Sequence, residues 1–192
     1  MAYQLDRTGW LDAACGCTHL KSPNFNQRPA GTTVSLLVIH NISLPPGDFG
    51  GPYVADLFMN RLDVTANPAF ESLRDLHVSA HFFIRRDGEV VQFVSTEDRA
   101  WHAGVSSLHG RKDCNDFSLG IEMEGTGAVP YTDAQYDALG SLVPALRARY
   151  PLRYAYGHED IAPGRKTDPG PSFDWSRFGS VSGFPLRALP KR

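Results

Sequence analysis

The chain has 192 residues, which suits one domain or at most two small ones. Hydrophobic residues make up 42% and charged residues 21%, so the chain is too apolar for a disordered protein. Nineteen basic against 21 acidic residues leave a net charge of -2. Nucleic acids and anionic membranes both require a basic excess, so neither is expected as the main partner.

Export, membrane insertion and disulfide bonding are not expected either. No apolar run approaches the ~20 residues that span a bilayer, and the first ten residues lack the apolar core of a signal peptide. Three cysteines cannot all pair, so we expect reduced thiols in a cytoplasmic protein. Only one residue separates Cys15 from Cys17, which is too close for the usual zinc-binding spacing.

The first half of the chain predicts a polar arm, two strands that form a hairpin, one further strand and one helix. Residues 1–33 form the arm, with one short helical turn. The β-branched and leucine run Val34–His40 predicts a strand buried on both faces. A helix is predicted over Tyr53–Met59, where apolar residues share a face. Alternating residues over 78–84 and 89–94, separated by an Asp-Gly turn, predict the hairpin.

The second half alternates strands with helices. Ser118–Glu124 alternates apolar with polar residues and predicts a strand. Thr132, followed three residues later by glutamine, fits a capping box that opens a helix toward Tyr150, which Pro144 should kink or interrupt. Two short elements follow, a strand over Tyr154–Gly157 and a helix over Phe173–Phe178. The pattern predicts an α/β fold, with helices packed on one sheet.

Two histidines occupy positions that are typical of a functional site. His40 ends a buried strand, and His158 follows a short one, where α/β proteins place their sites. Asp168 and Lys166 lie in a loop rich in proline and glycine. Two histidines and one carboxylate, with a fourth position for water, form the ligand set of a catalytic zinc ion. The alternative is that Lys166 and Asp168 form an exposed ion pair in a turn.

His77 and His81 are not expected to bind one metal ion together. Their four-residue spacing would suit a helix, but the surrounding alternation indicates a strand. Four strand residues separate two side chains by about 13 Å, far more than one zinc ion can bridge.

Glu122 lies in the middle of a predicted strand, where a carboxylate costs free energy unless it is paired or functional. The alternative places Glu122 at an edge or barrel rim that faces water. Trp101 and His102 combine an aromatic plate with a hydrogen-bonding group, which is consistent with a binding wall. Trp101 could equally be an ordinary core residue.

Six long motifs, which span most of residues 20–178, give the chain a specific resemblance. They are LLVIHNISLPPGDFGGP (36–52), VSAHFFIRRDGEVVQFV (78–94), RAWHAGVSS (99–107), CNDFSLGIEMEGT (114–126), YTDAQY (131–136) and GHEDIAPGRKTDPGPSFDW (157–175). They resemble the zinc-dependent N-acetylmuramoyl-L-alanine amidases, and most closely the branch that acts on 1,6-anhydro-muramyl peptides in cytoplasmic cell-wall recycling.

The resemblance implies a single domain with a mixed central sheet flanked by helices, as in peptidoglycan-recognition proteins. It also implies roles for five residues: His40, His158 and Asp168 match the zinc ligands, and Glu122 and Lys166 match the catalytic residues. Two departures, at Ala69 and at His77, stand where relatives have an aromatic residue and can have arginine. They affect possible contacts to the substrate.

The mechanism that the resemblance implies uses a zinc ion to lower the pKa of a water molecule. Glu122 would accept the proton of that water and pass it to the leaving nitrogen of L-alanine. Lys166 would stabilise the tetrahedral oxyanion. Asn41, Trp101 and His102 are expected to contact substrate, with the loop over residues 41–70 as one wall.

We therefore expect a monomeric amidase domain over residues 1–192, with an arm over 1–33 and a tail over 179–192. Its partner would be a small 1,6-anhydro-N-acetylmuramyl peptide, with no nucleic acid and no membrane. Two alternatives stay open. One is a non-catalytic muropeptide-binding module, which would lack one or more zinc ligands. The other is a secreted autolysin, which would act on intact wall.

Overall fold

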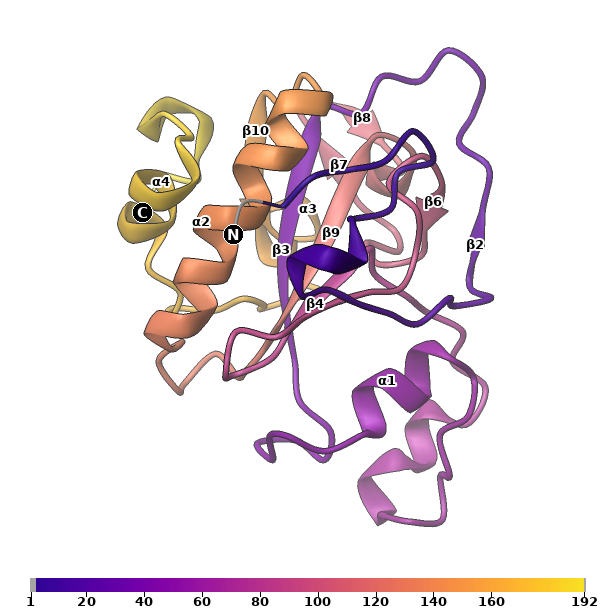
Figure 1. The fold of residues 1–192 in the computed structure, drawn as a ribbon. Coiled ribbons are helices and arrows are strands. Elements are labelled where there is room, and N and C mark those ends of the chain that lie inside the picture. Colours follow the sequence, from indigo (N-terminus) through magenta and orange to yellow (C-terminus); the bar gives the residue numbers. More distant parts are fainter. Residues whose placement is uncertain (1–2, 192) are drawn as a thin grey trace.

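Strand β9 (Ser118–Glu124) occupies the middle of the fold. In the computed structural model it pairs in parallel with β3 (Leu36–Ile42) on one side and with β4 (Phe82–Ile84) on the other. The six-stranded sheet has the order β1-β5-β4-β9-β3-β10, and β4 and β5 form its antiparallel pair. Helices flank this mixed sheet (Figure 1), which confirms the predicted fold class.

The structure describes residues 3–191. The remaining strands are β1 (Thr18–His19), β2 (Phe25–Asn26), β5 (Val90–Gln92), β6 (Arg99–Ala100), β7 (Ser107–Leu108), β8 (Arg111–Lys112) and β10 (Tyr154–Gly157). The helices are α1 (Tyr53–Phe58), α2 (Asp133–Arg149), α3 (His158–Ile161) and α4 (Trp175–Ser182), with 3-10 turns η1 (Ala13–Cys15), η2 (Pro68–Leu73), η3 (Cys114–Asp116) and η4 (Leu186–Ala188). Across residues 3–191, none of the helices combines the length and the apolar character needed to cross a membrane.

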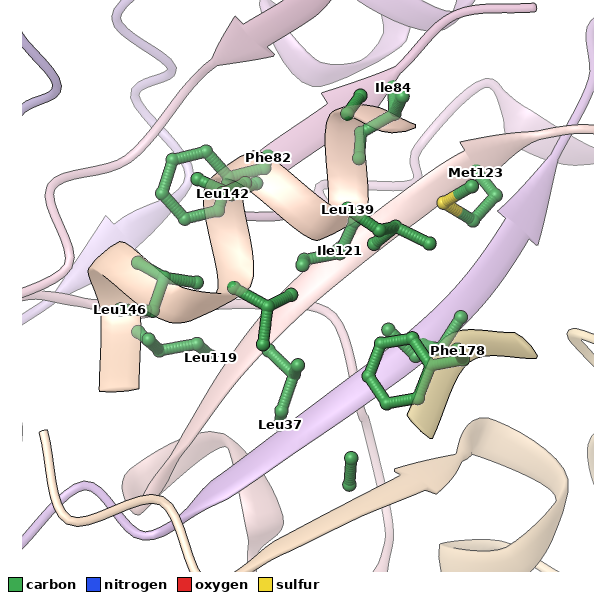
Figure 2. Packing of buried hydrophobic residues seen from close by; sticks show 14 of the residues in the cluster. Leu37, Phe82, Ile84, Leu119, Ile121, Met123, Leu139, Leu142, Leu146 and Phe178 are labelled. Carbon is green, nitrogen blue, oxygen red and sulfur yellow. The ribbon is translucent and has the colours of Figure 1, made fainter. Parts of the chain in front are cut away.

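The two faces of β9 bury different side chains. Its apolar face packs under α2 and α4 (Figure 2), where the cluster is formed by Leu37, Phe82, Ile84, Leu119, Ile121, Met123, Leu139, Leu142, Leu146 and Phe178, among others. The opposite face carries Ser118, Gly120, Glu122 and Glu124, which are also buried. Because alternate residues of a strand face opposite sides, the register of β9 decides which side chains reach the core and which reach the site.

Gln135 ties helix α2 to two strands. The predicted capping box is confirmed: the Thr132 hydroxyl accepts from the Gln135 backbone N–H, and the Gln135 carbonyl oxygen accepts from the Thr132 N–H. The Gln135 amide nitrogen also donates to the carbonyls of Ile84 and Glu124, at the ends of β4 and β9. This fully buried side chain therefore fixes α2 on the sheet.

Pro144 does not interrupt α2, although an interruption was one of the two outcomes expected of it. The helix runs without a break from Asp133 to Arg149. Pro144 itself is exposed, and the apolar residues on either side of it remain buried. Packing of the apolar stripe on the sheet therefore outweighs the loss of one helical hydrogen bond.

The predicted hairpin is shorter than the sequence pattern indicates. Strand β4 begins at Phe82, because the first residues of the predicted strand bond elsewhere: the Val78 carbonyl accepts from the Asn24 side chain, and the Ser79 N–H donates to the Trp101 carbonyl. The last helix also differs from the predicted 173–178: α4 begins at Trp175 after an Asp174 N-cap and ends at Ser182, within the predicted tail over 179–192.

The arm over residues 1–33 contributes strands to the fold as well as covering it. It contains the expected helical turn, η1, and two short strands that sequence periodicity did not reveal, because two residues give no periodic signal. Strand β1 extends the sheet beside β5, and β2 pairs with β6. The Arg28 guanidinium donates to the carbonyls of Asn115 and Asp116, so the arm is anchored next to the start of β9.

We predict that Gln135→Met lowers the free energy of unfolding by about 2–3 kcal/mol, because it leaves buried backbone carbonyls without a donor. Methionine keeps the length and the helix propensity of glutamine. Chemical denaturation measures the change. Asp137→Asn, at an exposed position of the same helix, is the control and should change stability little. Equal stabilities of the two variants would contradict the role of Gln135.

Candidate metal centre

The sheet brings His40, Glu122 and His158 to the same place. In the register of the parallel strands, His40 of β3 lies beside Glu122 of β9, and Ile39 lies beside Gly157 of β10. His158 is the next residue after Gly157 and begins α3. All three residues therefore lie at the carboxyl ends of neighbouring strands, where sites of α/β proteins gather.

Asp168 completes the group from the loop that follows α3. Its backbone carbonyl accepts from the Glu159 N–H. The neighbouring Pro169 carbonyl accepts from the Asn41 side-chain amide at 2.9 Å and from the Tyr131 hydroxyl at 2.9 Å. These three bonds fasten the loop to α3, β3 and the segment before α2, and so place the carboxylate beside the two histidines.

Three ligand atoms face one point. His40 Nδ1 lies 2.9 Å from His158 Nδ1 and 3.2 Å from Asp168 Oδ2, and His158 Nδ1 lies 3.1 Å from the same oxygen. Two ligand atoms bound to one tetrahedral zinc ion, with metal–ligand bonds of 2.0–2.1 Å, lie about 3.3 Å from each other. The three residues form a group that could hold a metal ion, and His77 and His81 belong to no such group among residues 3–191.

The burial of the site sets the charge of its residues. Burial lowers the pKa of His40 to about 4, so the ring is neutral and its Nδ1 can offer a lone pair. For Asp168, burial alone would raise the pKa, but the adjacent His158 and His40 outweigh burial and keep the pKa below its usual value. A neutral imidazole and an ionised carboxylate are the protonation states that a metal ion requires.

Glu122 is the side chain at this site with an unpaired atom. Only 9% of the residue is exposed, and its Oε2 is buried without a hydrogen-bond partner. Burial raises its pKa well above the usual value and the Asp168 carboxylate adds to this, whereas Lys166 lowers it. The edge position considered as an alternative is wrong, because β9 has a paired strand on each side. A buried carboxylate oxygen without a partner is costly unless a ligand or water binds it.

A cavity of about 270 Å³ opens onto these residues. Its polar wall includes Glu122, His158, Lys166 and Asp168, together with Asn41, Trp101 and His102, so every residue proposed from the sequence except the buried His40 lines it. The apolar part of the lining, called the apolar wall below, was not predicted from the sequence as a set of residues. It is formed by Ile42, Leu44, Leu57, Phe58, Leu73, Leu76 and Val78. For Leu57 and Phe58, the apolar face of the helix predicted over 53–59 was the sequence feature that could have indicated a place in the cavity wall.

The three expected substrate-contact residues differ in how freely they face the cavity. Trp101 is partly exposed, and its Nε1 donates to the Asn26 side chain of the arm. The Asn41 amide is engaged by Pro169. His102 is 8% exposed, and both of its ring nitrogens contact protein groups, His40 and Ser118.

Lys166 does not pair with Asp168. The side chain of Lys166 is exposed and lines the cavity, whereas Asp168 turns toward the histidines. The exposed ion pair considered as an alternative is therefore wrong. A cation at the rim of the cavity can instead face a substrate that enters it.

Comparison with known proteins gives one consistent match. The family model described as N-acetylmuramoyl-L-alanine amidase matches residues 30–171. The 1,6-anhydro-N-acetylmuramyl-L-alanine amidase AmpD of Citrobacter freundii is 56% identical over 175 residues, which are 90% of this chain and 92% of that protein.

Solved structures agree with the sequence match. A crystal structure of a selenomethionine AmpD derivative is 54% identical, superposes with a TM-score of 0.88, and covers 92% of this chain and 98% of its own. The amidase AmiD of E. coli, in complex with anhydro-N-acetylmuramic acid-L-Ala-D-gamma-Glu-L-Lys, is 25% identical, with a TM-score of 0.58 over 92% of this chain and 65% of its own.

We predict that the purified chain binds one zinc ion and that Asp168→Asn loses stoichiometric binding, because asparagine supplies no anionic oxygen to the site. Elemental analysis after dialysis, with competition by a chelator, measures the metal. The control is Asp174→Asn, at an N-cap that asparagine also serves. Full zinc content in Asp168→Asn would place the ion elsewhere.

Proposed function

The chain belongs to the N-acetylmuramoyl-L-alanine amidase family, and from this premise we propose that it hydrolyses the amide bond between the lactyl group of a 1,6-anhydro-N-acetylmuramyl residue and L-alanine. The name of the C. freundii relative describes this substrate, and the relative matches this chain over nearly the whole length of both. The AmiD neighbour binds a peptide of the same chemical class.

One observation carries the chemical part of the proposal: three metal-ligating atoms and an unpaired carboxylate oxygen border one cavity. We infer that His40, His158 and Asp168 hold a zinc ion there. When bound, zinc polarises a carbonyl oxygen and lowers the pKa of water toward neutrality.

Different residues of the chain then transfer the proton and stabilise the charges. Glu122 Oε2, buried and without a protein partner, accepts a proton from the attacking water and returns it to the leaving nitrogen of L-alanine. Lys166 lies on the cavity wall, where its ammonium group faces the oxyanion that develops on the lactyl carbonyl. Asp168, whose pKa lies below its usual value, is ionised and offsets the positive charge of the centre.

The biological setting is also part of the proposal. We infer that the partner is a small muropeptide, that the chain acts as a monomer, and that it works in the cytoplasm during peptidoglycan recycling. The similarity to relatives that act on the anhydro form supports the substrate. The alternative of a non-catalytic binding module would require a missing ligand, whereas all three candidate ligands lie together.

We expect Glu122→Gln to retain zinc and lower kcat by at least about 10²-fold, because the amide cannot accept the proton of the attacking water. Steady-state kinetics on an anhydro-muropeptide, with metal analysis of the same sample, provide the measurement.

Glu124→Gln is the matched control. Glu124 is a buried carboxylate two residues along the same strand, but its oxygens accept from the Gly50 and Arg86 N–H groups. This substitution should cost stability and leave kcat close to that of the wild type. Comparable kcat losses in both variants would remove the catalytic role of Glu122.

The substrate proposal predicts a preference among three forms of the same bond. Release of the L-alanine-headed peptide should be fastest from 1,6-anhydro-muropeptides, slower from muropeptides with a free reducing end, and slowest from intact sacculi. The cavity of about 270 Å³ accepts a short sugar–peptide more readily than a long glycan. Mass spectrometry of the products measures each rate. Equal or faster cleavage of sacculi would favour the autolysin alternative and leave the amidase activity in place.

A further inference from the structure

His102 lies between a proposed metal ligand and the polar face of β9. Its Nδ1 is 2.9 Å from His40 Nε2, and its Nε2 is 3.2 Å from the Ser118 hydroxyl. The ring lies directly against Gly120, where an added Cβ would stand 2.5 Å from the ring carbon Cγ. Position 120 therefore has no room for a side chain while His102 keeps this place.

The directions of these hydrogen bonds follow from their last member. The Ser118 hydroxyl lies 2.6 Å from the Cys114 carbonyl, which can only accept, so the single hydroxyl proton points there. The Ser118 oxygen must then accept from His102 Nε2–H. With a neutral ring, His102 Nδ1 carries a lone pair and accepts from His40 Nε2–H. A neutral His40 is left with its lone pair on Nδ1, the atom that faces His158 and Asp168.

The residue after His102, Ala103, orients the second histidine of the proposed metal site, His158. His158 Nε2 lies 3.0 Å from the Ala103 carbonyl, so this nitrogen carries the proton and Nδ1 the lone pair. The Asn115 side-chain oxygen accepts from the backbone N–H groups of both His102 and Ala103, at 3.1 and 2.8 Å. One buried asparagine therefore fixes the backbone that supports both histidines.

We propose that His102 is a positioning residue. Oriented by Ser118 and the Cys114 carbonyl, it holds His40 in the tautomer with a proton on Nε2 and a lone pair on Nδ1, the atom that would bind the metal. This inference rests on the proposed metal site. It gives His102 a function other than the substrate contact expected from the sequence. Groups that orient a ligating histidine typically change metal affinity by about 10- to 100-fold when they are removed.

The first test reads the tautomers directly, in the unaltered chain. Long-range proton–nitrogen NMR spectra of the metal-free protein, with histidine labelled with nitrogen-15, distinguish protonated from unprotonated ring nitrogens. We expect protonated Nε2 and unprotonated Nδ1 in both His40 and His102. A proton on Nδ1 of either ring overturns the inference, and this result does not depend on whether zinc binds.

The second test compares two substitutions of similar size. His102→Asn can place its side-chain oxygen where Nδ1 stands and still accept from His40, whereas His102→Leu cannot. We expect zinc affinity, measured by chelator competition, to fall about 10- to 100-fold in His102→Leu and to stay near the wild-type value in His102→Asn. Equal affinities in the two variants overturn the inference. Failure of the wild-type chain to bind zinc would instead refute the proposed metal site.

A serine pair separates positioning from general stability. Ser118→Ala removes the acceptor of His102 and should weaken zinc binding. Ser22→Ala removes a buried hydroxyl that donates to the Phe58 carbonyl at 2.5 Å, so its structural cost is similar, but Ser22 has no contact with the histidines. We expect zinc affinity to be unchanged in Ser22→Ala. Equal losses of affinity in the two variants would show that His102 acts only through stability.

Discussion

The burial of a polar face on the central strand is the constraint on which this structure depends. Ser118, Glu122 and Glu124 are removed from water inside the sheet, where each polar atom needs a partner. Ser118 bonds to His102 and Cys114, and Glu124 accepts from two backbone N–H groups. Glu122 Oε2 remains without a partner. The fold therefore satisfies its own polar groups on this face and leaves an acceptor where the cavity opens.

Two parallel pairings and one loop convert that constraint into a site. The pairings of β3 with β9 and of β3 with β10 align the ends of three strands. Residues distant in the sequence therefore lie close together at these ends. The loop that carries Asp168 is held by hydrogen bonds from three different elements. Electrostatics completes the arrangement, because burial keeps His40 neutral while the two histidines beside Asp168 keep its pKa low.

The sequence predicted the elements with strong periodicity and the residues at the ends of strands. Strands β9 and β10 have the predicted bounds, and α2 begins at the predicted capping box. Local patterns failed where tertiary partners decide the outcome. Val78 and Ser79 continue the alternation of a strand but bond to the arm and to Trp101, and Pro144 is tolerated because its neighbours pack on the sheet.

The surroundings of the site were the least predictable part. His102, in the loop after β6, contacts His40 only because Gly120 of β9 leaves space for the ring. No pattern within the sequence of either segment predicts this contact. The metal-ligand set could be proposed because strand ends converge by a general rule. The groups that orient those ligands obey no such rule. They come from loops whose paths are set by single side chains such as Asn115.

The polar and apolar walls of the cavity come from different parts of the chain, so the residues that react differ from those that select the substrate. The reacting groups lie on strand ends and on a loop tied to them. The apolar wall comes from the end of β3 and from the segment that leaves β3, contains α1 and η2, and returns before β4. Figure 1 shows this segment beyond the end of β3, away from α2 and α4. Its core is a separate cluster that includes Leu57, Phe58 and Phe93. Substitutions in this wall can therefore alter which sugar–peptide fits while the sheet keeps Glu122 and the histidines in place.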